Sequence, residues 1–191
     1  MSAPGEPLVL EGGGHILIRP AEEQDLPPCL LLDHSSSSDY VWQVEAREDQ
    51  GALVYSFRTV RLPRSMPIIT PHDSTVMEAA IQSGECLLVA EVGERIAGYV
   101  LIRPDHACGT AWVRQLVVDR PLRRQRLGST LLHEAQQWAR ASNLARITVE
   151  TQTKNHPAIA FCQRHGLTLC GFNDRYYPNQ DIALFFTQSL R

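Results

Sequence analysis

The chain has 191 residues, enough for one domain with a sizeable core and few for two. Its composition, 43% hydrophobic and 20% charged residues, is typical of a soluble globular protein. A formal net charge of −3 argues against a protein that binds nucleic acid over its whole surface, because such domains are strongly basic.

The cysteines and the amino terminus predict a cytoplasmic protein. The five cysteines are odd in number and scattered, without CxxC or Cys/His metal spacing, so we expect reduced thiols and no metal site. No basic start followed by an apolar run marks a signal peptide, and no segment is long enough to cross a membrane. We expect residues 1–14 to form a mobile tail and residues 15–191 a single domain.

The first third of the chain predicts few regular elements. Residues 15–19 read as a strand, and a helix opens near Ala21; the Pro27–Pro28 pair should interrupt this helix or end its first part. Residues 33–40 are a polar loop. In residues 40–73, alternating apolar residues such as Leu53, Tyr55 and Phe57 suggest an extended arm, but several prolines leave its shape open. We expect this region to contribute to substrate specificity, because irregular regions often carry function.

The middle of the chain is more regular. Residues 86–92 and 96–104 are β-rich runs joined by a turn-compatible tripeptide, which predicts a hairpin. Residues 110–119 form a further strand. Apolar residues then recur every three to four positions, which predicts a helix that ends near residues 142–143; they are Leu127, Leu131, Ala135, Trp138 and Ala139.

The carboxyl-terminal third continues the alternation. Residues 145–151 form a strand that follows a helix, so we expect it to run parallel to the strand before that helix. Residues 155–166 form a short helix with Pro157 in its first turn and Gly166 just past its end. Two closing strands complete a mixed α/β layer structure.

Arginines gather immediately before the central helix. Five of them lie within residues 114–126, although the chain is slightly acidic. The first N–H groups of a helix have no internal partner and carry partial positive charge, and guanidinium groups bind phosphate well, so this segment predicts a phosphate-binding loop. Neither GxxxxGK[ST] nor GxGxxG occurs. One alternative is that these arginines are solvated surface charges. Another is a stripe that binds RNA or DNA, although the segment lacks the interleaved aromatic residues that such a stripe usually has.

The string "RRQRLG" at residues 123–128 resembles the cofactor motif [QR]xxGx[GA] of the GNAT superfamily of acyl-CoA N-acyltransferases, with Arg126 in place of the middle glycine. The order of the flanking strands and helices is similar to that family from about Glu85 to Leu190. The strings "VETQTKNHPAIAFCQRHGL" and "DRYYPNQDIALFF" resemble the streptothricin acetyltransferase branch. The resemblance implies a GNAT-like mixed, mostly antiparallel twisted sheet with a splayed parallel strand pair at its centre and helices on both faces.

The resemblance also implies a cofactor and the residues that hold it. Acetyl-CoA would donate an acetyl group to a primary amine of a small molecule or peptide, by direct attack in a ternary complex. Leu116 and Val118 would offer main-chain hydrogen bonds to the pantetheine arm, and N–H groups near Val117 would stabilise the thioester oxygen. Asn155 would make a further contact with the cofactor. The residues that would bind its pyrophosphate are Arg123, Arg124, Gln125, Arg126, Leu127, Gly128 and Ser129.

The catalytic candidates are fewer. Glu150 ends a strand that faces the cleft and would take the amine's proton through water; the alternative is a carboxylate that binds the substrate ammonium or a nearby arginine. Many relatives carry a Tyr proton donor where this chain has Cys162, which would donate a proton or, more often, simply pack. Tyr177, or alternatively Tyr176, is a substitute donor. Asp119 shapes the turn after its strand.

These substitutions keep a second function open. A non-catalytic acyl-CoA-binding or sensing module would also carry the phosphate loop while lacking the usual Tyr and the middle glycine. For either function we expect no nucleic-acid partner and no membrane association, and a homodimer is one open possibility for assembly.

Overall fold

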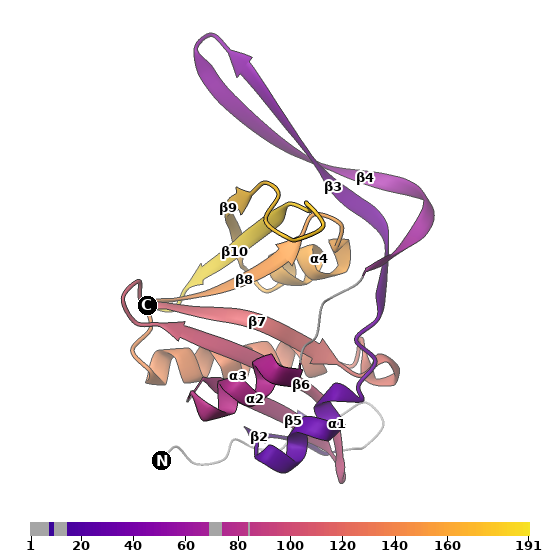
Figure 1. Cartoon of the computed structure of the whole chain (residues 1–191), viewed down its shortest axis with the longest axis vertical. Helices are drawn as coiled ribbons and strands as arrows, with labels where there is room; N and C mark the ends of the chain where they lie inside the picture. The colour runs from indigo at the N-terminus through magenta and orange to yellow at the C-terminus, as the bar shows by residue number, and fades with distance from the viewer. Residues whose placement is uncertain (1–7, 10–14, 69–73, 84) are drawn as a thin grey trace. The chain divides into compact units, whose positions relative to one another are not determined.

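Figure 1 shows a computed structural model of the chain, which describes residues 8–9, 15–68, 74–83 and 85–191. The chain divides into two compact units, which are described separately. The first comprises residues 1–34, 70–148 and 189–191, and the second comprises residues 35–69 and 149–188. The tail predicted for residues 1–14 lies outside the described residues, apart from the short strand β1 (Leu8–Val9).

Antiparallel strands form the sheet of the first unit. They follow the order β1, β2 (His15–Pro20), β5 (Cys86–Val92), β6 (Arg95–Asp105) and β7 (Thr110–Val118). The registers of all four neighbouring pairs are antiparallel. The predicted hairpin is confirmed: β5 and β6 meet at Gly93, whose φ of 65° suits a tight turn.

The prolines do not break the helical segment, although its first part is a separate 3-10 turn that ends before them. A 3-10 turn (Glu23–Asp25) leads directly into α1 (Leu26–Leu30), with Pro27 and Pro28 in its first turn. A proline there removes only an N–H group that has no helical partner, so it is compatible with the helix start. Helix α2 (Ser74–Gln82) was not expected from the sequence; Met77 and Ala80, three positions apart, form its buried side.

Helices cover both faces of the first unit's sheet (Figure 1). Residues of α1 and α2 pack with alternate side chains of β5 and β6, including Val89 and Tyr99. Helix α3 (Leu127–Ala141) packs on the opposite face, where the side chain of Leu131 approaches Gly98 of β6. Because helices cover both faces, side chains on both sides of β5 and β6 are buried, which explains the almost continuous apolar runs in the sequences of these strands.

Strand β8 (Arg146–Gln152) begins in the first unit and continues in the second. The N–H groups of Ala145 and Arg146 donate to the carbonyl of Gly109, at 2.8 and 3.2 Å. Since Gly109 immediately precedes β7, the strands β7 and β8 start side by side, as expected for strands joined by a helical crossover.

The rest of the second unit's sheet continues from β8 through β10 (Ala183–Ser189) to β9 (Thr168–Asn173). β9 and β10 are antiparallel. Helix α4 (His156–Arg164) has Pro157 in its first turn, and Gly166, with φ of 75°, follows its end, which confirms the prediction for this helix.

The arm whose shape the sequence left open is extended, as its alternation suggests: it is a long two-stranded antiparallel ribbon of β3 (Ser36–Asp49) and β4 (Ala52–Ile68), drawn in purple in Figure 1. The predicted polar loop is therefore wrong from Ser36 onward. Gln50 and Gly51 make the turn, with φ of 49° and 84°. Pro63 has no N–H group to donate to β3. It is tolerated in β4 because it lies where the register of the two strands shifts. Within this unit, rings of the ribbon pack against Phe172 and Phe186.

Candidate functional site

The loop after β7 is built on Asp119. Its carboxylate Oδ1 accepts a hydrogen bond from the backbone N–H of Arg120 at 3.0 Å, which caps a short 3-10 turn over Arg120–Leu122. The same carboxylate forms an ion pair with Arg95, with 3.5 Å between Nη2 and Oδ2. The prediction that Asp119 shapes this turn is confirmed.

Arg123 anchors the loop from within. Its Nε donates to the carbonyl of Val118 at 2.8 Å, and its Nη2 donates to the carbonyl of Asp33. The side chain is half-buried. Because two edges of the guanidinium already bind main-chain carbonyls, the first arginine of the motif fixes the loop to the end of β7 and to the segment after α1.

Arg126 has a left-handed backbone conformation, which glycine adopts more readily than other residues. It is the residue before α3 and has φ of 66° and ψ of −6°, in the left-handed region. Arg124 also has a positive φ, of 67°. Such conformations cost a non-glycine residue about 1–2 kcal/mol, so the rest of the loop must hold them. The Arg124 and Arg126 side chains are exposed.

The start of α3 presents main-chain donors. The first helical hydrogen bond runs from Thr130 N–H to the carbonyl of Arg126 at 3.0 Å, so the N–H groups of Leu127 and Gly128 precede the helical ladder. No side-chain hydrogen bond caps this end. Leu127 is buried and contributes its side chain to the core, which leaves only its backbone for a ligand. The arrangement suits an anion at the helix start.

The main chain of β7 faces two ways. The N–H of Asp119 donates to the carbonyl of Ala97, just before Gly98 of β6, at 2.9 Å. Since successive residues of a strand point their polar groups to opposite sides, Val117 also faces β6, whereas Leu116 and Val118 face away from it. These two are the residues predicted to bind the pantetheine arm, and that contact stays a prediction.

Gly98 supports this strand and was missed by sequence reasoning. It pairs with Val118, and a Cβ added at Gly98 would lie 2.6 Å from the carbonyl oxygen of Val117 and 3.3 Å from the Leu131 side chain. Only glycine permits such a close approach of β6 to β7. The signal was available in the sequence, as an isolated glycine within an apolar strand run.

In the second unit, Glu150 of β8 is held by a tyrosine. The hydroxyl of Tyr176 donates to Glu150 Oε2 at 3.0 Å. The ring of Tyr176 lies edge-on to that of Tyr177, with 5.1 Å between centroids. Of the two tyrosines considered from the sequence, Tyr176 has the described hydroxyl contact with the candidate base.

Cys162 and Asn155 both have structural roles within α4. Cys162 is completely buried, and desolvation raises the pKa of its thiol to about 12. So weak an acid favours packing, the alternative already preferred from the sequence, over proton donation. Asn155 Oδ1 accepts from the N–H of Ala158 at 3.2 Å and caps the helix. Its predicted contact with the cofactor stays a prediction.

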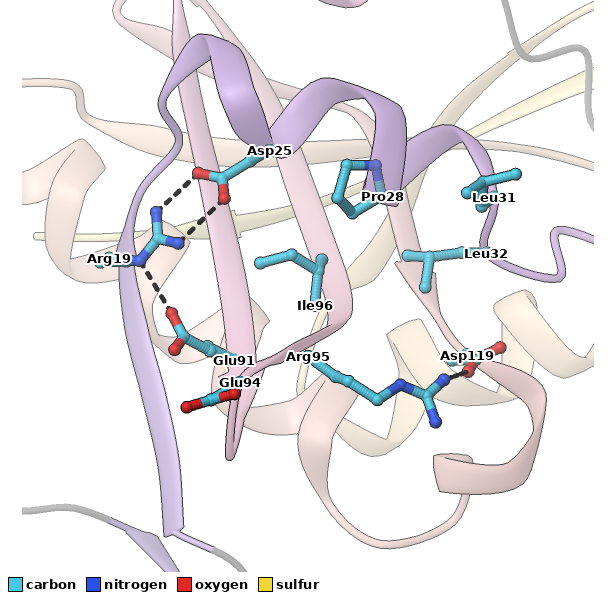
Figure 2. A pocket seen from close by; sticks show the side chains of 10 residues that line it. All are labelled: Arg19, Asp25, Pro28, Leu31, Leu32, Glu91, Glu94, Arg95, Ile96 and Asp119. Carbon is cyan, nitrogen blue, oxygen red and sulfur yellow. Dashed lines mark hydrogen bonds and ion pairs between the residues drawn. The ribbon is translucent and has the colours of Figure 1, made fainter.

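A cavity of about 400 Å³ lies elsewhere in the first unit (Figure 2). Arg19 crosses one side of it, bound to Asp25 at 2.6 and 2.9 Å and to Glu91 at 3.0 Å. The hydrogen bond from Arg19 is the main reason that the pKa of the buried Asp25 carboxyl is lowered. No predicted site residue lines this cavity, although Asp119 does. Most of the charged side chains that line this cavity form ion pairs with one another.

The described residues contain neither a helix that could cross a membrane nor a cluster of metal-ligating side chains. None of their helices combines the length and apolar character that a membrane crossing needs. Nor does the described part of the chain bring three His, Cys, Asp or Glu side chains together as a metal site would require.

Sequence comparison identifies the family. Residues 53–167, more than half of the chain, match the acetyltransferase (GNAT) family. The chain belongs to this family. The GNAT protein is also 23% identical over 128 residues to streptothricin acetyltransferase A of Bacillus subtilis (strain 168), covering 64% of this chain and 73% of that protein.

Solved structures share the fold of this GNAT acetyltransferase. The crystal structure of nourseothricin acetyltransferase matches with a TM-score of 0.79 and 22% identity, covering 92% of this chain and 99% of the other. A Bacillus anthracis str. Ames protein assigned as a streptothricin acetyltransferase, solved with acetyl coenzyme A, matches with a TM-score of 0.73 and 22% identity, over 91% and 97% of the two chains. The predicted mixed α/β GNAT fold and the resemblance to the streptothricin branch are confirmed.

Proposed function

We propose that this protein transfers an acetyl group from acetyl-CoA to a primary amine of a small molecule or peptide, by direct attack in a ternary complex. Membership of the acetyltransferase family supports the reaction class. The similarity of fold to a protein solved with acetyl coenzyme A supports the donor.

The observation that carries the proposal is the backbone of the loop before α3. Arg126 adopts a left-handed conformation there, which a glycine at the same position would also favour, and this supports a loop that turns its main chain toward an anion. The proposal gives the pyrophosphate to the main chain of residues 124–129, with the exposed Arg124 and Arg126 side chains adding positive charge. Arg123 supports the loop from behind. Coenzyme A carries several phosphate charges, which explains why a slightly acidic chain concentrates arginines here.

The reaction needs a neutral amine, a stabilised thioester oxygen and a leaving thiol. Glu150 is the proposed base, and main-chain N–H groups near Val117 and Val118 are the proposed donors to the developing oxyanion. Of the predicted proton donors, Tyr177 suits the role better than the buried Cys162, and it would relay to the CoA thiolate the second proton that the amine nitrogen loses. The pantetheine contacts of Leu116 and Val118 and the contact of Asn155 complete the predicted site.

A turnover assay tests the proposal. The protein is incubated with acetyl-CoA and a panel of amines that includes streptothricin and short peptides, and the release of free CoA thiol is measured. Streptothricin belongs in the panel because relatives carry that name. We expect amine-dependent thiol release with at least one acceptor. Tight binding of acetyl-CoA without turnover on any amine would instead favour the non-catalytic sensing module.

The compartment and the assembly are also part of the proposal. We place the protein in the cytoplasm, where its cysteines, all five of them free thiols, stay reduced. Size-exclusion chromatography with light scattering distinguishes a monomer from the homodimer considered from the sequence.

A further inference from the structure

The segment between β9 and β10 in the second unit is a closed loop. The N–H groups of Tyr176 and Tyr177 both donate to the carbonyl of Asp181, at 3.1 and 3.3 Å. The N–H of Gln180 donates to the carbonyl of Tyr177 at 2.8 Å. Its conformation is therefore set by its own backbone, including the left-handed residues Arg175 and Gln180, with φ of 54° and 66°.

Asp181 ties this loop to the segment before α4. Its Oδ1 forms an ion pair with Lys154, and its Oδ2 accepts from the side-chain amide of Asn179 at 2.8 Å. The Asp181 side chain is only 10% exposed, which makes the ion pair a stronger constraint than a surface pair. The loop is thus fixed at its base.

The ring of Tyr176 is held although it is 40% exposed. It lies nearly perpendicular to the rings of Tyr177 and Phe185, with interplanar angles of 88° and centroid distances of 5.1 and 5.8 Å. Edge-to-face contacts of this kind orient a side chain beyond simple burial. The oriented ring directs its hydroxyl to Glu150 Oε2 at 3.0 Å.

We propose that Tyr176 is a positioning residue that holds the Glu150 carboxylate in place to receive the ammonium group of the acceptor. The inference rests on the acetyltransferase function proposed above. A carboxylate offers about four lone-pair sites on two oxygens, so one phenolic hydrogen bond on Oε2 fixes its plane and is compatible with further N–H donors. A fixed carboxylate loses less rotational freedom when the acceptor binds.

Two protons leave the acceptor nitrogen in the proposed step. Glu150 takes one proton from the ammonium, directly or through water, and later releases it to solvent. The lone pair of the neutral nitrogen forms the C–N bond at the thioester carbonyl, the C–S bond breaks, and the thiolate of CoA takes the second proton that nitrogen loses. Tyr176 keeps its proton throughout. The pair therefore favours acceptors that bind as cations, and amines over alcohols.

The test is a double-mutant cycle on steady-state kinetics with the best amine of the panel. Tyr176→Phe keeps the ring contacts and removes only the hydroxyl. We expect kcat/KM for the amine to fall about tenfold, while KM for acetyl-CoA is unchanged. In the Glu150→Gln background the same change should have no further effect, because the two groups act as one unit. Tyr55→Phe, which removes a similarly exposed hydroxyl in the same unit, is the reference for thermal stability.

The split between KM and kcat separates positioning from a general structural effect. In Tyr176→Phe the Glu150 carboxylate is no longer held when the acceptor binds, so the loss should be a rise in KM for the amine with kcat nearly unchanged. An unchanged KM for the amine, additive losses in the cycle, or the same rise in KM in Tyr177→Phe would overturn the inference. If the unmodified protein turns over no amine, the proposed function itself fails, which is a distinct result.

Discussion

Replacing Gly98 with alanine tests how closely β6 must approach β7. The new Cβ would lie 2.6 Å from the Val117 carbonyl oxygen, whereas real Cβ contacts stay above 3.0 Å. The strands must therefore separate by about 0.4 Å or more in a close-packed interior, where such changes typically cost about 1–3 kcal/mol. At about 2 kcal/mol, Tm falls by about 4–8 °C for a protein of this size.

The same displacement moves the main chain of Leu116 and Val118. Because a small displacement of the groups that bind a ligand weakens its binding, we expect KM for acetyl-CoA to rise about 3–10-fold. Thermal unfolding and CoA-release kinetics measure the two effects. Gly171→Ala is the matched control, because Gly171 also lies in a strand and its Cβ would meet nothing within 4 Å. Equal Tm and KM values for the two variants would refute the reasoning.

Three further predictions concern the cofactor loop and the buried thiols. Gly128→Asp should abolish acetyl-CoA binding in calorimetry by placing a carboxylate against phosphate, whereas the neutral Gly128→Asn should retain measurable binding; equal affinities count against the loop assignment. Arg126→Gly should raise Tm by about 2–4 °C, because it relieves about 1 kcal/mol of left-handed strain; an unchanged or lower Tm argues against strain. Burial raises the pKa of the Cys29, Cys86 and Cys162 thiols to about 12, so above pH 9 they ionise only in the unfolded chain. The free energy of unfolding should thus be level below about pH 8 and fall above it by up to about 1.4 kcal/mol per pH unit per thiol, with a shallower fall in Cys162→Ala; urea unfolding from pH 7 to 10 that shows no fall contradicts this.

Elements with strong local signals were predicted correctly. The period of Leu127, Leu131 and Ala135 locates α3, and Pro157 and Gly166 bracket α4, because periodicity, helix-start prolines and C-terminal glycines act within a few residues. The alternation in the arm indicated extended chain, but the pairing of β3 with β4 was missed, because Pro63 and Pro67 read as strand breakers. Their effect depends on which edge of a strand is paired, which no local pattern reveals.

The candidate site divides in the same way. The sequence by itself determined the family resemblance, the loop that begins at Arg123 and the choice of Glu150, since each depends on residue types at fixed spacing along the chain. Only the tertiary structure decided that Arg123 binds two carbonyls, that Arg126 adopts a glycine conformation and that Tyr176 reaches Glu150 across 26 positions. Hydrogen bonds and left-handed backbone arise from contacts between distant segments, and these contacts exist only once the chain has folded.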